Sequence, residues 1–576
     1  MSGGPLTLGT GGHIDHGKTR LIEALTGTNT DRLPEERERG ISIALGYAQL
    51  ELPSGRRLSV VDVPGHERFV RTMIAGATGI DLFLLVVDAG EGPKAQTHEH
   101  VEILRLLGLE RGVIALTKID AVDDDRAAAA EKAAGRLLPT AEIVRVSAVT
   151  GEGLSDLLAA LERAADTVER RPRDAPTRLY VDRVFSLPGA GVVVTGTLWS
   201  GAIGAGDRLE VLPAGIEVRV RSVEVHGTAV ARAEAGQRVA LAVSTERRRR
   251  IARGDALVAP GAYAPSYRLD VTLDPPGAVA DGMRVQVCHA TSSVAARVVA
   301  VGPGHAQLRL ERQLVAARGD RLVLRRETTL GGARVLDPAP PRRVDPERMR
   351  SFDTGDPRAV LTALVDAPVL VADVRVRASL TEGELAAAGD GFVRAGPWIC
   401  SAAWLAATAA RANASLAALE DAVDPGRPVS ALLGTEPWAS AIAPLLGLET
   451  AAGKLYLPGR RPSAGSRGRE IEAQLAAAGL EPVPVADGEL AAQLEREGRL
   501  VRLGDGLAIG PDAYALAKAA LVEECERVGS ISLARFRDLL GSSRRVAQLL
   551  LERFDTDRIT LRVGDARRLR RSAASG

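Results

Sequence analysis

Cysteine is scarce in this chain, with three residues among 576. Cys288, Cys400 and Cys525 lie far apart, and no CxxC pair occurs. This distribution argues against a disulfide framework and against a cysteine-rich zinc site. It fits a reducing compartment, so we expect a cytoplasmic protein.

Aromatic residues are also few, at 3% of the chain, so stacking on aromatic rings is not expected to dominate nucleic-acid binding. The formal net charge is +1, which means that any nucleic-acid surface must be local. The strongest apolar run, residues 82–87, is far shorter than the ~20 residues that cross a bilayer. The N-terminus lacks the basic and apolar regions of a signal peptide. We expect no membrane contact.

The length predicts three to five domains of roughly 100–200 residues each. Residues 1–174 alternate short apolar, β-branched runs with helical stretches, which is typical of a parallel sheet covered by helices. Residues 175–262 and 263–338 hold short strands between glycine and proline turns, which favours two β-barrels. Proline-rich stretches at 171–176 and 337–343 are the expected linkers.

Helical segments interrupted by small hairpins fill residues 339–576. The hairpins around Gly504 and Gly564 look alike and lie 60 residues apart, with a weaker echo at 389–393. This period indicates repeated winged-helix modules, the last at about 511–576. An unrelated helical tail is the alternative. The expected fold class is therefore multidomain: an α/β domain, two β-barrels and a C-terminal array of winged-helix modules.

A phosphate-binding loop opens the α/β domain. Residues 12–19, GHIDHGKT, match GxxxxGK[ST] between an apolar strand and a helical stretch, which is the context that this P-loop motif requires. Glycines let backbone amides approach the phosphates, and the helix N-terminus adds favourable partial charge. We expect Lys18 to reach the outer phosphates and Thr19 to bind Mg²⁺. The predicted phosphate-binding residues are Gly12, His13, Asp15, His16, Gly17, Lys18, Thr19 and Gly65.

Two further motifs follow in the order of a regulatory GTPase. Asp62 and Gly65, in DVPG, can hold Mg²⁺ through water and sense the terminal phosphate. Asp120, in TKID, can accept two hydrogen bonds from guanine that adenine cannot supply. Thr117 stands where the NKxD consensus has asparagine. The predicted guanine-binding residues are Thr117, Lys118, Asp120, Ser147 and Ala148. GTP or GDP with Mg²⁺ is the expected ligand; Asp120 argues against a nucleotide kinase.

Residues 31–47 resemble the first switch of the selenocysteine-specific elongation factors, the SelB family of EF-Tu-like translational GTPases. DRLPEE and RGISIALGY stand close to the family's DRLPEEKxRGITIDLGYA. The resemblance implies Mg²⁺ ligation by Thr19, Ser42 and, through water, Asp62. DVPGHE is similar to the DxPGHE of the EF-Tu class. It implies that His66 is the catalytic residue that positions the attacking water, with the ribosome completing the site.

The first barrel carries the resemblance further, because residues 181–197 are similar to the opening of SelB's first barrel, DRxFxxxGxGxVVTG. A selenol is anionic at neutral pH, so a cationic pocket could select its ester over a seryl ester. The resemblance implies a pocket made by Tyr47, Asp182, Arg183 and Arg238. Surface salt bridges and core packing are the alternative roles of these residues.

The end of the chain resembles the last winged helix of SelB, FRDxxGxSRKxxxxLLExFDxxGxTxRxGDxRxL, with Arg545 in place of lysine and no glycine at 557–559. In the family this module binds an mRNA hairpin. Arginines crowd this region, and such side chains can contact phosphates and a splayed base. A solvated basic tail is the alternative. The predicted hairpin contacts are Arg544, Arg545, Arg562 and Arg567. The run 247–250 is either a tRNA contact or a solvated loop.

The resemblance implies a monomeric GTPase that delivers selenocysteinyl-tRNA to the ribosome at UGA codons beside an mRNA hairpin. Two alternatives stay open. One is another EF-Tu-like factor that carries tRNA and has an RNA-binding tail. The other is an RNA-binding regulator whose GTPase is a switch.

Overall fold

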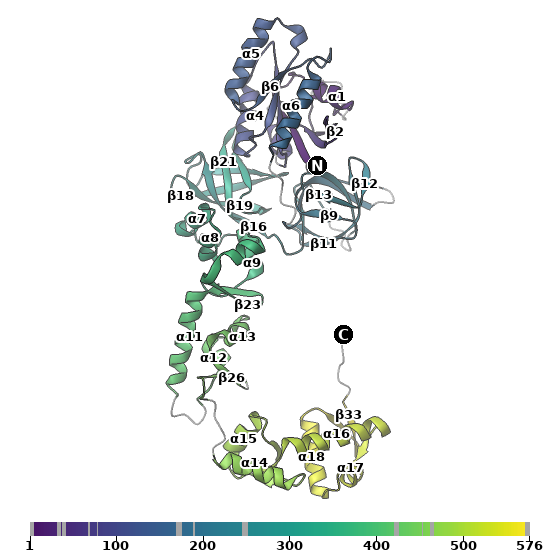
Figure 1. The fold of residues 1–576 in the computed structure, drawn as a ribbon, viewed down its shortest axis with the longest axis vertical. Coiled ribbons are helices and arrows are strands. Elements are labelled where there is room, and N and C mark those ends of the chain that lie inside the picture. Colours follow the sequence, from purple (N-terminus) through teal and green to yellow (C-terminus); the bar gives the residue numbers. More distant parts are fainter. Residues whose placement is uncertain are drawn as a thin grey trace. The chain divides into compact units, whose positions relative to one another are not determined.

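The computed structural model describes residues 5–31, 36, 42–66, 69–77, 79–168, 175–187, 191–244, 251–419, 425–451, 453–460 and 466–570. The switch residues 37–41, the linker residues 171–174 and the arginine run 247–250 lie outside this part of the chain. Two compact units form (Figure 1): residues 1–392 with 399–401, and residues 393–398 with 402–576. No helix in the described ranges is both long and apolar enough to cross a membrane.

The first unit begins with a six-stranded α/β sheet of order β2-β3-β1-β4-β5-β6. Its elements are β1 (Leu6–Gly11), α1 (Lys18–Thr26), β2 (Gly46–Glu51), β3 (Arg57–Asp62), α3 (Val70–Ala77), β4 (Leu82–Asp88), α4 (Ala95–Leu106), β5 (Gly112–Thr117), η2 (Ile119–Ala121), α5 (Asp124–Leu137), β6 (Glu142–Arg145) and α6 (Leu154–Asp166). Residues of α1 and α6 pack on one face, and residues of α3, α4 and α5 pack on the other. Every residue of β4 is therefore buried.

The predicted parallel sheet needs one correction, at β2. This strand pairs antiparallel with β3, from Gly46 opposite Asp62 to Glu51 opposite Arg57. The connection between them, residues 52–56, is far too short for a parallel crossover, which needs a dozen or more residues. The switch segment before β2 is thereby attached to the sheet edge beside Asp62.

Two closed barrels of six strands follow, as the sequence predicted. The first has β7 (Arg178–Leu187), β8 (Gly191–Ser200), β10 (Arg208–Leu212), β11 (Ile216–Val225), β14 (Arg238–Ser244) and β15 (Ala256–Val258), with β9 (Ala202–Gly204), β12 (Thr228–Val230) and β13 (Arg232–Glu234) attached. The second has β16 (Pro265–Asp274), β17 (Arg284–His289), β18 (Ser292–Val301), β19 (His305–Val315), β20 (Arg321–Arg325) and β21 (Thr329–Asp337). Alternate inward residues fill each barrel with valine and leucine.

Helices complete the first unit, and aspartates begin two of them. Asp345 and Asp356 accept hydrogen bonds from the first backbone amides of their helices, and a proline follows each. The elements are α7 (Pro346–Asp353), α8 (Pro357–Leu364), β22 (Val369–Leu370), α9 (Val371–Ala378), α10 (Glu382–Ala387) and η3 (Gly389–Gly391). β23 (Phe392–Ala395), which begins within the weaker repeat at 389–393, and β24 (Trp398–Ser401) come next.

The second unit repeats one pattern three times: a helix, a short strand, one or more further helices and a hairpin. The short strand and the two hairpin strands form one three-stranded sheet. The sheets have the orders β25-β27-β26, β28-β30-β29 and β31-β33-β32. This confirms the winged-helix repeat. The elements are α11 (Ala402–Ala417), β25 (Arg427–Pro428), α12 (Val429–Leu433), α13 (Ala439–Ile442), η4 (Ala443–Leu446), β26 (Glu449–Ala451), β27 (Lys454–Tyr456), α14 (Ser466–Ala478), β28 (Val483–Pro484), α15 (Gly488–Arg496), β29 (Val501–Gly504), β30 (Leu507–Ile509), α16 (Pro511–Val528), β31 (Ile531–Ser532), α17 (Leu533–Leu540), α18 (Arg544–Thr556), β32 (Thr560–Val563) and β33 (Ala566–Leu569).

Candidate functional site

The P-loop lies between β1 and α1, where glycine is required at Gly12. Its φ is 124°, and a Cβ there would lie 2.2 Å from the Val86 carbonyl oxygen. The Lys18 ammonium folds back on the loop and donates to the carbonyls of Gly12 (3.1 Å) and His13 (2.6 Å). Burial lowers the pKa of Lys18 to about 8. The loop is thus held in the curved shape that a phosphate group needs.

The two P-loop histidines differ in surroundings, and neither lies in a metal-binding group. His16 is buried, and burial and the neighbouring His13 lower its pKa to about 4. Its Nδ1 lies 3.4 Å from the Val86 carbonyl oxygen. Within the described residues, no group of three or more His, Cys, Asp or Glu could hold a metal ion. The side chain of His16 therefore packs in the core, and only its backbone can face a phosphate.

Oxygen atoms gather where Mg²⁺ was predicted. The Thr19 hydroxyl donates to Asp62 Oδ2 at 3.0 Å and lies 3.1 Å from the Ser42 hydroxyl. Ser42 donates in turn to Asp31 Oδ1 at 2.7 Å, and Thr30 donates to Asp62 at 2.6 Å. Mg²⁺ prefers oxygen ligands, with one or two carboxylates beside waters and phosphates. The residues present fit that ion, and Asp31, the first residue of DRLPEE, is an addition to the predicted set of Thr19, Ser42 and Asp62.

The second switch segment packs closely on the P-loop. A Cβ at Gly65 would lie 2.3 Å from Lys18 Nζ and 2.8 Å from the Ile14 amide nitrogen, so only glycine fits here. His66 follows, half buried, with its ring 5.9 Å from that of Phe69. The segment is therefore positioned to sense the occupant of the P-loop.

The predicted guanine-binding residues lie at the ends of β5 and β6. The buried Thr117 hydroxyl donates to the His16 carbonyl at 2.8 Å, which joins this motif to the P-loop. Lys118 Nζ lies 2.8 Å from Asp88 Oδ2. Burial alone would raise the pKa of Asp88, but Lys118 and nearby amides lower it. Asp120 is exposed and able to receive a base.

Ser147 and Ala148 complete this region from the loop after β6. The Ser147 hydroxyl accepts hydrogen bonds from the amides of Val149 (3.2 Å) and Thr150 (3.1 Å). Its side chain is buried, so it shapes the turn, while the half-buried Ala148 lies next to it. The turn therefore has the fixed backbone that a base-contacting loop needs.

Tyr47 joins the α/β domain to the first barrel, together with the other predicted pocket residues. The Arg238 guanidinium carbon lies 3.5 Å from the centre of the Tyr47 ring, and that of Arg183 lies 4.8 Å away. Arg183 donates to the Leu45 carbonyl at 2.6 Å. Burial and Asp182 raise the pKa of the Tyr47 hydroxyl, while the two arginines oppose that change. The tyrosine is neutral here at physiological pH.

Asp182 neutralises Arg238 in this arrangement. Arg238 Nη2 donates to Asp182 Oδ1 at 2.9 Å and to the Thr195 hydroxyl at 3.0 Å. Thr195 itself donates to the same carboxylate oxygen at 2.5 Å. The sequence motifs did not predict a role for Thr195 in this cluster, although it lies within the stretch 181–197 that carries the family resemblance.

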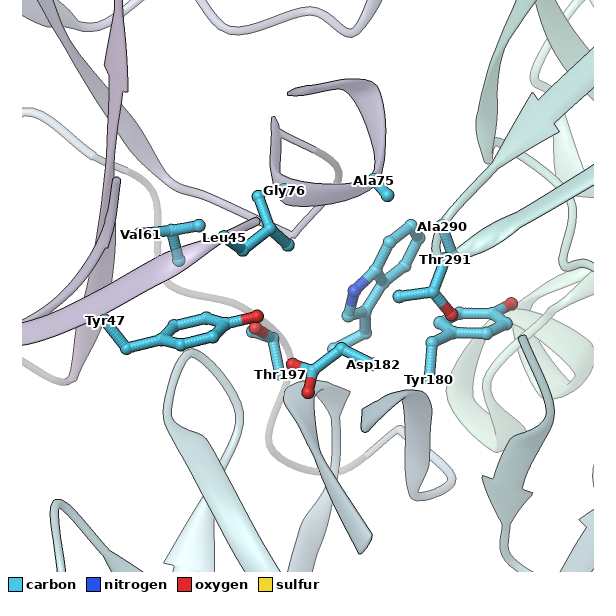
Figure 2. Close-up of a pocket in the computed structure, with 11 residues that line it drawn as sticks. Leu45, Tyr47, Val61, Ala75, Gly76, Tyr180, Asp182, Thr197, Ala290 and Thr291 are labelled. Carbon is cyan, nitrogen blue, oxygen red and sulfur yellow. The ribbon is translucent and has the colours of Figure 1, made fainter. Parts of the chain in front are cut away.

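A small cavity lies beside these side chains (Figure 2). Its volume is about 10 Å³, so it holds at most one water molecule. The residues that line it are Leu45, Tyr47, Val61, Ala75, Gly76, Tyr180, Asp182, Thr197, Trp199, Ala290 and Thr291. The cavity is therefore closed in this conformation and too small for anything larger than a water molecule.

The predicted hairpin-binding arginines of the last winged helix divide into two kinds. Arg544 and Arg545 are exposed in the first turn of α18, where the helix dipole disfavours positive charge. Arg562 is exposed on the β32–β33 hairpin. Arg567 is buried, and its Nε donates to Asp555 at 3.1 Å. Arg567 thus holds the module together and is not available on its surface, whereas the other three are.

Comparison with known proteins identifies the family of this chain. The family model of the elongation factor Tu GTP binding domain matches residues 5–167, and that of elongation factor Tu domain 2 matches residues 191–258. The selenocysteine-specific elongation factor beta-barrel domain matches residues 266–342, and the winged helix of elongation factor SelB matches residues 523–569. The chain belongs to the SelB family of elongation factors.

Individual SelB-family proteins agree with this assignment. The chain is 40% identical over 403 residues to the selenocysteine-specific elongation factor of Desulfomicrobium baculatum, covering 66% of this chain and 63% of that protein. It is also 40% identical over 348 residues to the Escherichia coli K12 factor, covering 59% of this chain and 56% of that protein. The matched regions thus span less than two thirds of these curated relatives.

A solved structure matches nearly the whole chain. The crystal structure of the bacterial selenocysteine-specific elongation factor EF-Sec superposes with a TM-score of 0.75 at 27% identity. The match covers 98% of this chain and 100% of that one. The α/β domain, the two barrels and the winged-helix array therefore all have counterparts in a SelB-family structure.

Proposed function

We propose that this SelB-family chain is a cytoplasmic, selenocysteine-specific elongation factor. It binds GTP, carries selenocysteinyl-tRNA to the ribosome at UGA codons marked by an mRNA hairpin, and hydrolyses GTP to GDP and phosphate on codon recognition. The observation that carries this proposal is the cationic cluster around Tyr47, which lies directly beside the switch segment of a GTPase domain. A nucleotide-dependent movement of that segment would act on the tRNA pocket at once.

The proposed GTP and Mg²⁺ binding rests on the polar groups of the P-loop region. Lys18 would leave the carbonyls of Gly12 and His13 to bind the outer phosphates. The hydroxyls of Thr19 and Ser42 would hold Mg²⁺ directly, with Asp62 acting through water. Mg²⁺, when bound, neutralises charge on the phosphates. His66 would orient the attacking water once the ribosome has fixed its loop.

The proposed preference for selenocysteinyl-tRNA over seryl-tRNA rests on charge. A selenolate is anionic at neutral pH, whereas a seryl hydroxyl is neutral, so Arg183 and Arg238 can favour the former. In the closed pocket Asp182 compensates Arg238 and the Leu45 carbonyl holds Arg183. When Tyr47 moves away, both guanidinium groups become available to an anion. Because Leu45 and Tyr47 follow Ser42 closely in the chain, the switch can control that access.

The test compares two esters on one tRNA. We expect the GTP-loaded chain to bind selenocysteinyl-tRNA at least about tenfold more tightly than the same tRNA bearing serine, which is ~1.4 kcal/mol. Arg183→Ala and Arg238→Ala should abolish that preference, and Arg238→Lys should retain part of it. Arg136→Ala, on the exposed side of α5, is the control.

Either outcome is informative. A preference that depends on Arg183 and Arg238 supports both the selenocysteine assignment and the pocket. Equal binding of the two esters by the unmodified chain would contradict the assignment. It would leave an EF-Tu-like tRNA carrier with an RNA-binding tail.

A further inference from the structure

Three threonine hydroxyls hold Asp62, the carboxylate that is expected to act on Mg²⁺ through water. Thr10 donates to Oδ1 at 2.7 Å, while Thr30 and Thr19 donate to Oδ2 at 2.6 Å and 3.0 Å. Asp62, Thr10 and Thr30 are 2%, 2% and 3% exposed, so water does not compete for these hydrogen bonds. The sequence motifs assign roles to Thr19 and Asp62, but they assign none to Thr30.

The three hydrogen bonds differ in length, and the difference separates their roles. Hydrogen bonds from a hydroxyl to a carboxylate are short, at ~2.5–2.7 Å, and roughly twice as strong as neutral ones. The bonds from Thr10 and Thr30 lie in this range, whereas the bond from Thr19 is longer. Asp62 therefore releases Thr19 most easily, and Thr19 is the hydroxyl that is predicted to bind the metal.

When the Thr19 hydroxyl turns away from Asp62, Thr30 still holds Oδ2 and Thr10 still holds Oδ1. Both contacts are needed, because the terminal torsion of an aspartate side chain is broad and a carboxylate held at one oxygen can rotate. Thr10 is itself fixed, since its hydroxyl oxygen accepts a hydrogen bond from the Val63 amide at 2.9 Å. A hydroxyl on each oxygen therefore keeps the plane of the carboxylate constant, with Oδ2 on the side of Thr19.

Gly46 provides the space in which Thr30 lies. A Cβ at this position would lie 2.5 Å from Thr30 Cβ and 3.1 Å from Thr30 Oγ1. The backbone of Gly46 is not in the left-handed region, so its own conformation does not require glycine. In the register of β2 and β3, Gly46 is opposite Asp62. The missing side chain at Gly46 therefore allows Thr30 to reach the carboxylate.

We propose that Thr30 is a positioning residue of the Mg²⁺ site, whose hydroxyl keeps Asp62 Oδ2 in the orientation that the carboxylate needs to act on the metal through water. This inference rests on the proposed function, which places GTP and Mg²⁺ here, and it adds a residue to that site. Thr30 acts through Asp62 and does not bind the metal itself. Loss of its hydroxyl should therefore weaken the effect of Mg²⁺ and leave nucleotide binding without Mg²⁺ unchanged.

A purely structural role of Thr30 would have a different signature. A buried hydroxyl needs a hydrogen-bonding partner wherever it lies, and the carboxylate could serve only that need. Removing such a hydroxyl would destabilise the domain and weaken nucleotide binding by the same factor with and without Mg²⁺. The affinity for GDP at the two extremes of Mg²⁺ concentration therefore separates the two roles.

The experiment titrates the full-length chain with fluorescent GDP, first in EDTA and then at increasing concentrations of MgCl₂. Thr30→Val keeps the shape of the side chain and removes its hydroxyl, whereas Thr30→Ser keeps the hydroxyl. Thr28→Val makes the same change at an exposed position nearby and is the matched control. Gly46→Ala places a Cβ against Thr30 and tests the same contact from the other side. Thermal stability of all the proteins is measured alongside.

We expect Thr30→Val to raise the MgCl₂ concentration that gives half of the Mg²⁺ effect by about fivefold. This is a fraction of the full value of a hydrogen bond to a charged group, because Thr30 acts through Asp62. The affinity for GDP in EDTA should not change. Thr30→Ser and Thr28→Val should both behave like the unmodified chain, and Gly46→Ala should behave like Thr30→Val.

Three results would overturn the proposal. The first is an unchanged Mg²⁺ dependence in Thr30→Val. The second is a loss of GDP affinity that is equal in EDTA and in MgCl₂, which would show a structural role alone. The third is a Thr30→Ser variant that behaves like Thr30→Val. Failure of the proposed function looks different: GDP binding by the unmodified chain would then not depend on Mg²⁺, or that chain would bind the two aminoacyl esters equally.

Discussion

Asp320 should be the residue whose replacement most weakens the contact between the two barrels. It accepts hydrogen bonds from Arg178 Nη1 (2.7 Å) and Nη2 (3.0 Å), from His289 Nε2 (2.9 Å) and from the Ala317 amide (2.8 Å). Arg178 belongs to the first barrel, and Asp320 lies just before β20 of the second. Burial alone would raise the pKa of Asp320, but Arg178 and His289 lower it below its usual range.

Asp320→Asn keeps the shape of the side chain and removes its charge. Breaking a buried ion pair by removing one partner costs about 3–5 kcal/mol, because the other charge stays buried and unpaired. Here the Arg178 guanidinium also lies over the rings of Tyr180 (5.6 Å), Trp199 (5.1 Å) and Tyr263 (5.2 Å). Cation–π contacts offset about 1–2 kcal/mol of that loss. We therefore expect a cost of about 3 kcal/mol.

Hydrogen exchange read by mass spectrometry is the suitable assay, because the chain has several domains and a single unfolding transition would mix them. Amides of β7 and β20 should lose protection equivalent to about 3 kcal/mol. Adding Arg178→Met to Asp320→Asn should restore most of it, since a neutral pair leaves no buried charge. Asp124→Asn, which removes one acid from the exposed Arg145, should cost about 0–1 kcal/mol. A loss below about 1 kcal/mol for Asp320→Asn would refute the reasoning, because the pair would then be reached by water.

Four further outcomes are expected. The pKa of Lys18 is lowered to about 8, and bound phosphates should raise it again and restore the positive charge. Calorimetry in two buffers should therefore detect proton uptake on GDP binding near pH 9 but not near pH 7. Lys18→Gln should abolish that uptake. In the nucleotide-free chain the same shift makes the folded state gain stability as the pH rises from about 8 to 10.5. Gly12→Ala, whose Cβ would lie 2.2 Å from the Val86 oxygen, should weaken GDP binding far more than Gly27→Ala, where a Cβ meets nothing within 4 Å; equal effects in fluorescent-GDP titrations would contradict this. Arg544→Gln should lower the slope of log affinity against log salt for RNA hairpin binding by about 1 without changing thermal stability. Arg567→Gln should instead lower the melting temperature of the last winged-helix module. The reverse pattern would show that burial was assigned to the wrong arginine.

Motifs that depend on a fixed backbone were the most predictable part of this chain. The P-loop, DVPG and TKID each need particular residues in a particular order, and each lies at a strand end in the structure. Barrels and winged-helix repeats could also be predicted, because alternation and turn glycines report strands directly. β2 escaped the prediction of a parallel sheet because a short connection, not the composition of the strand, decides its direction.

Side-chain partners were far less predictable, since they come from distant parts of the chain. Thr195 joins Asp182 and Arg238 only because β7, β8 and β14 are neighbours in the barrel. Asp31 accepts a hydrogen bond from the Ser42 hydroxyl, although the two residues lie 11 positions apart in the chain. No spacing rule in the sequence expresses either contact. The closure of the pocket over Tyr47 is likewise a property of packed side chains.

Arginine shows most clearly why the remaining roles could not be predicted. Arg562 and Arg567 are opposite each other in one hairpin, in the same basic stretch. Arg567 is buried because Asp555 at the end of α18 accepts its hydrogen bond, while Arg562 bonds the nearby Gly564 carbonyl and stays exposed. The same distinction separates the paired Arg178 from the exposed Arg544. Composition counts these side chains as equal charges. The position of one acid decides whether an arginine stabilises the fold or remains free to bind a phosphate.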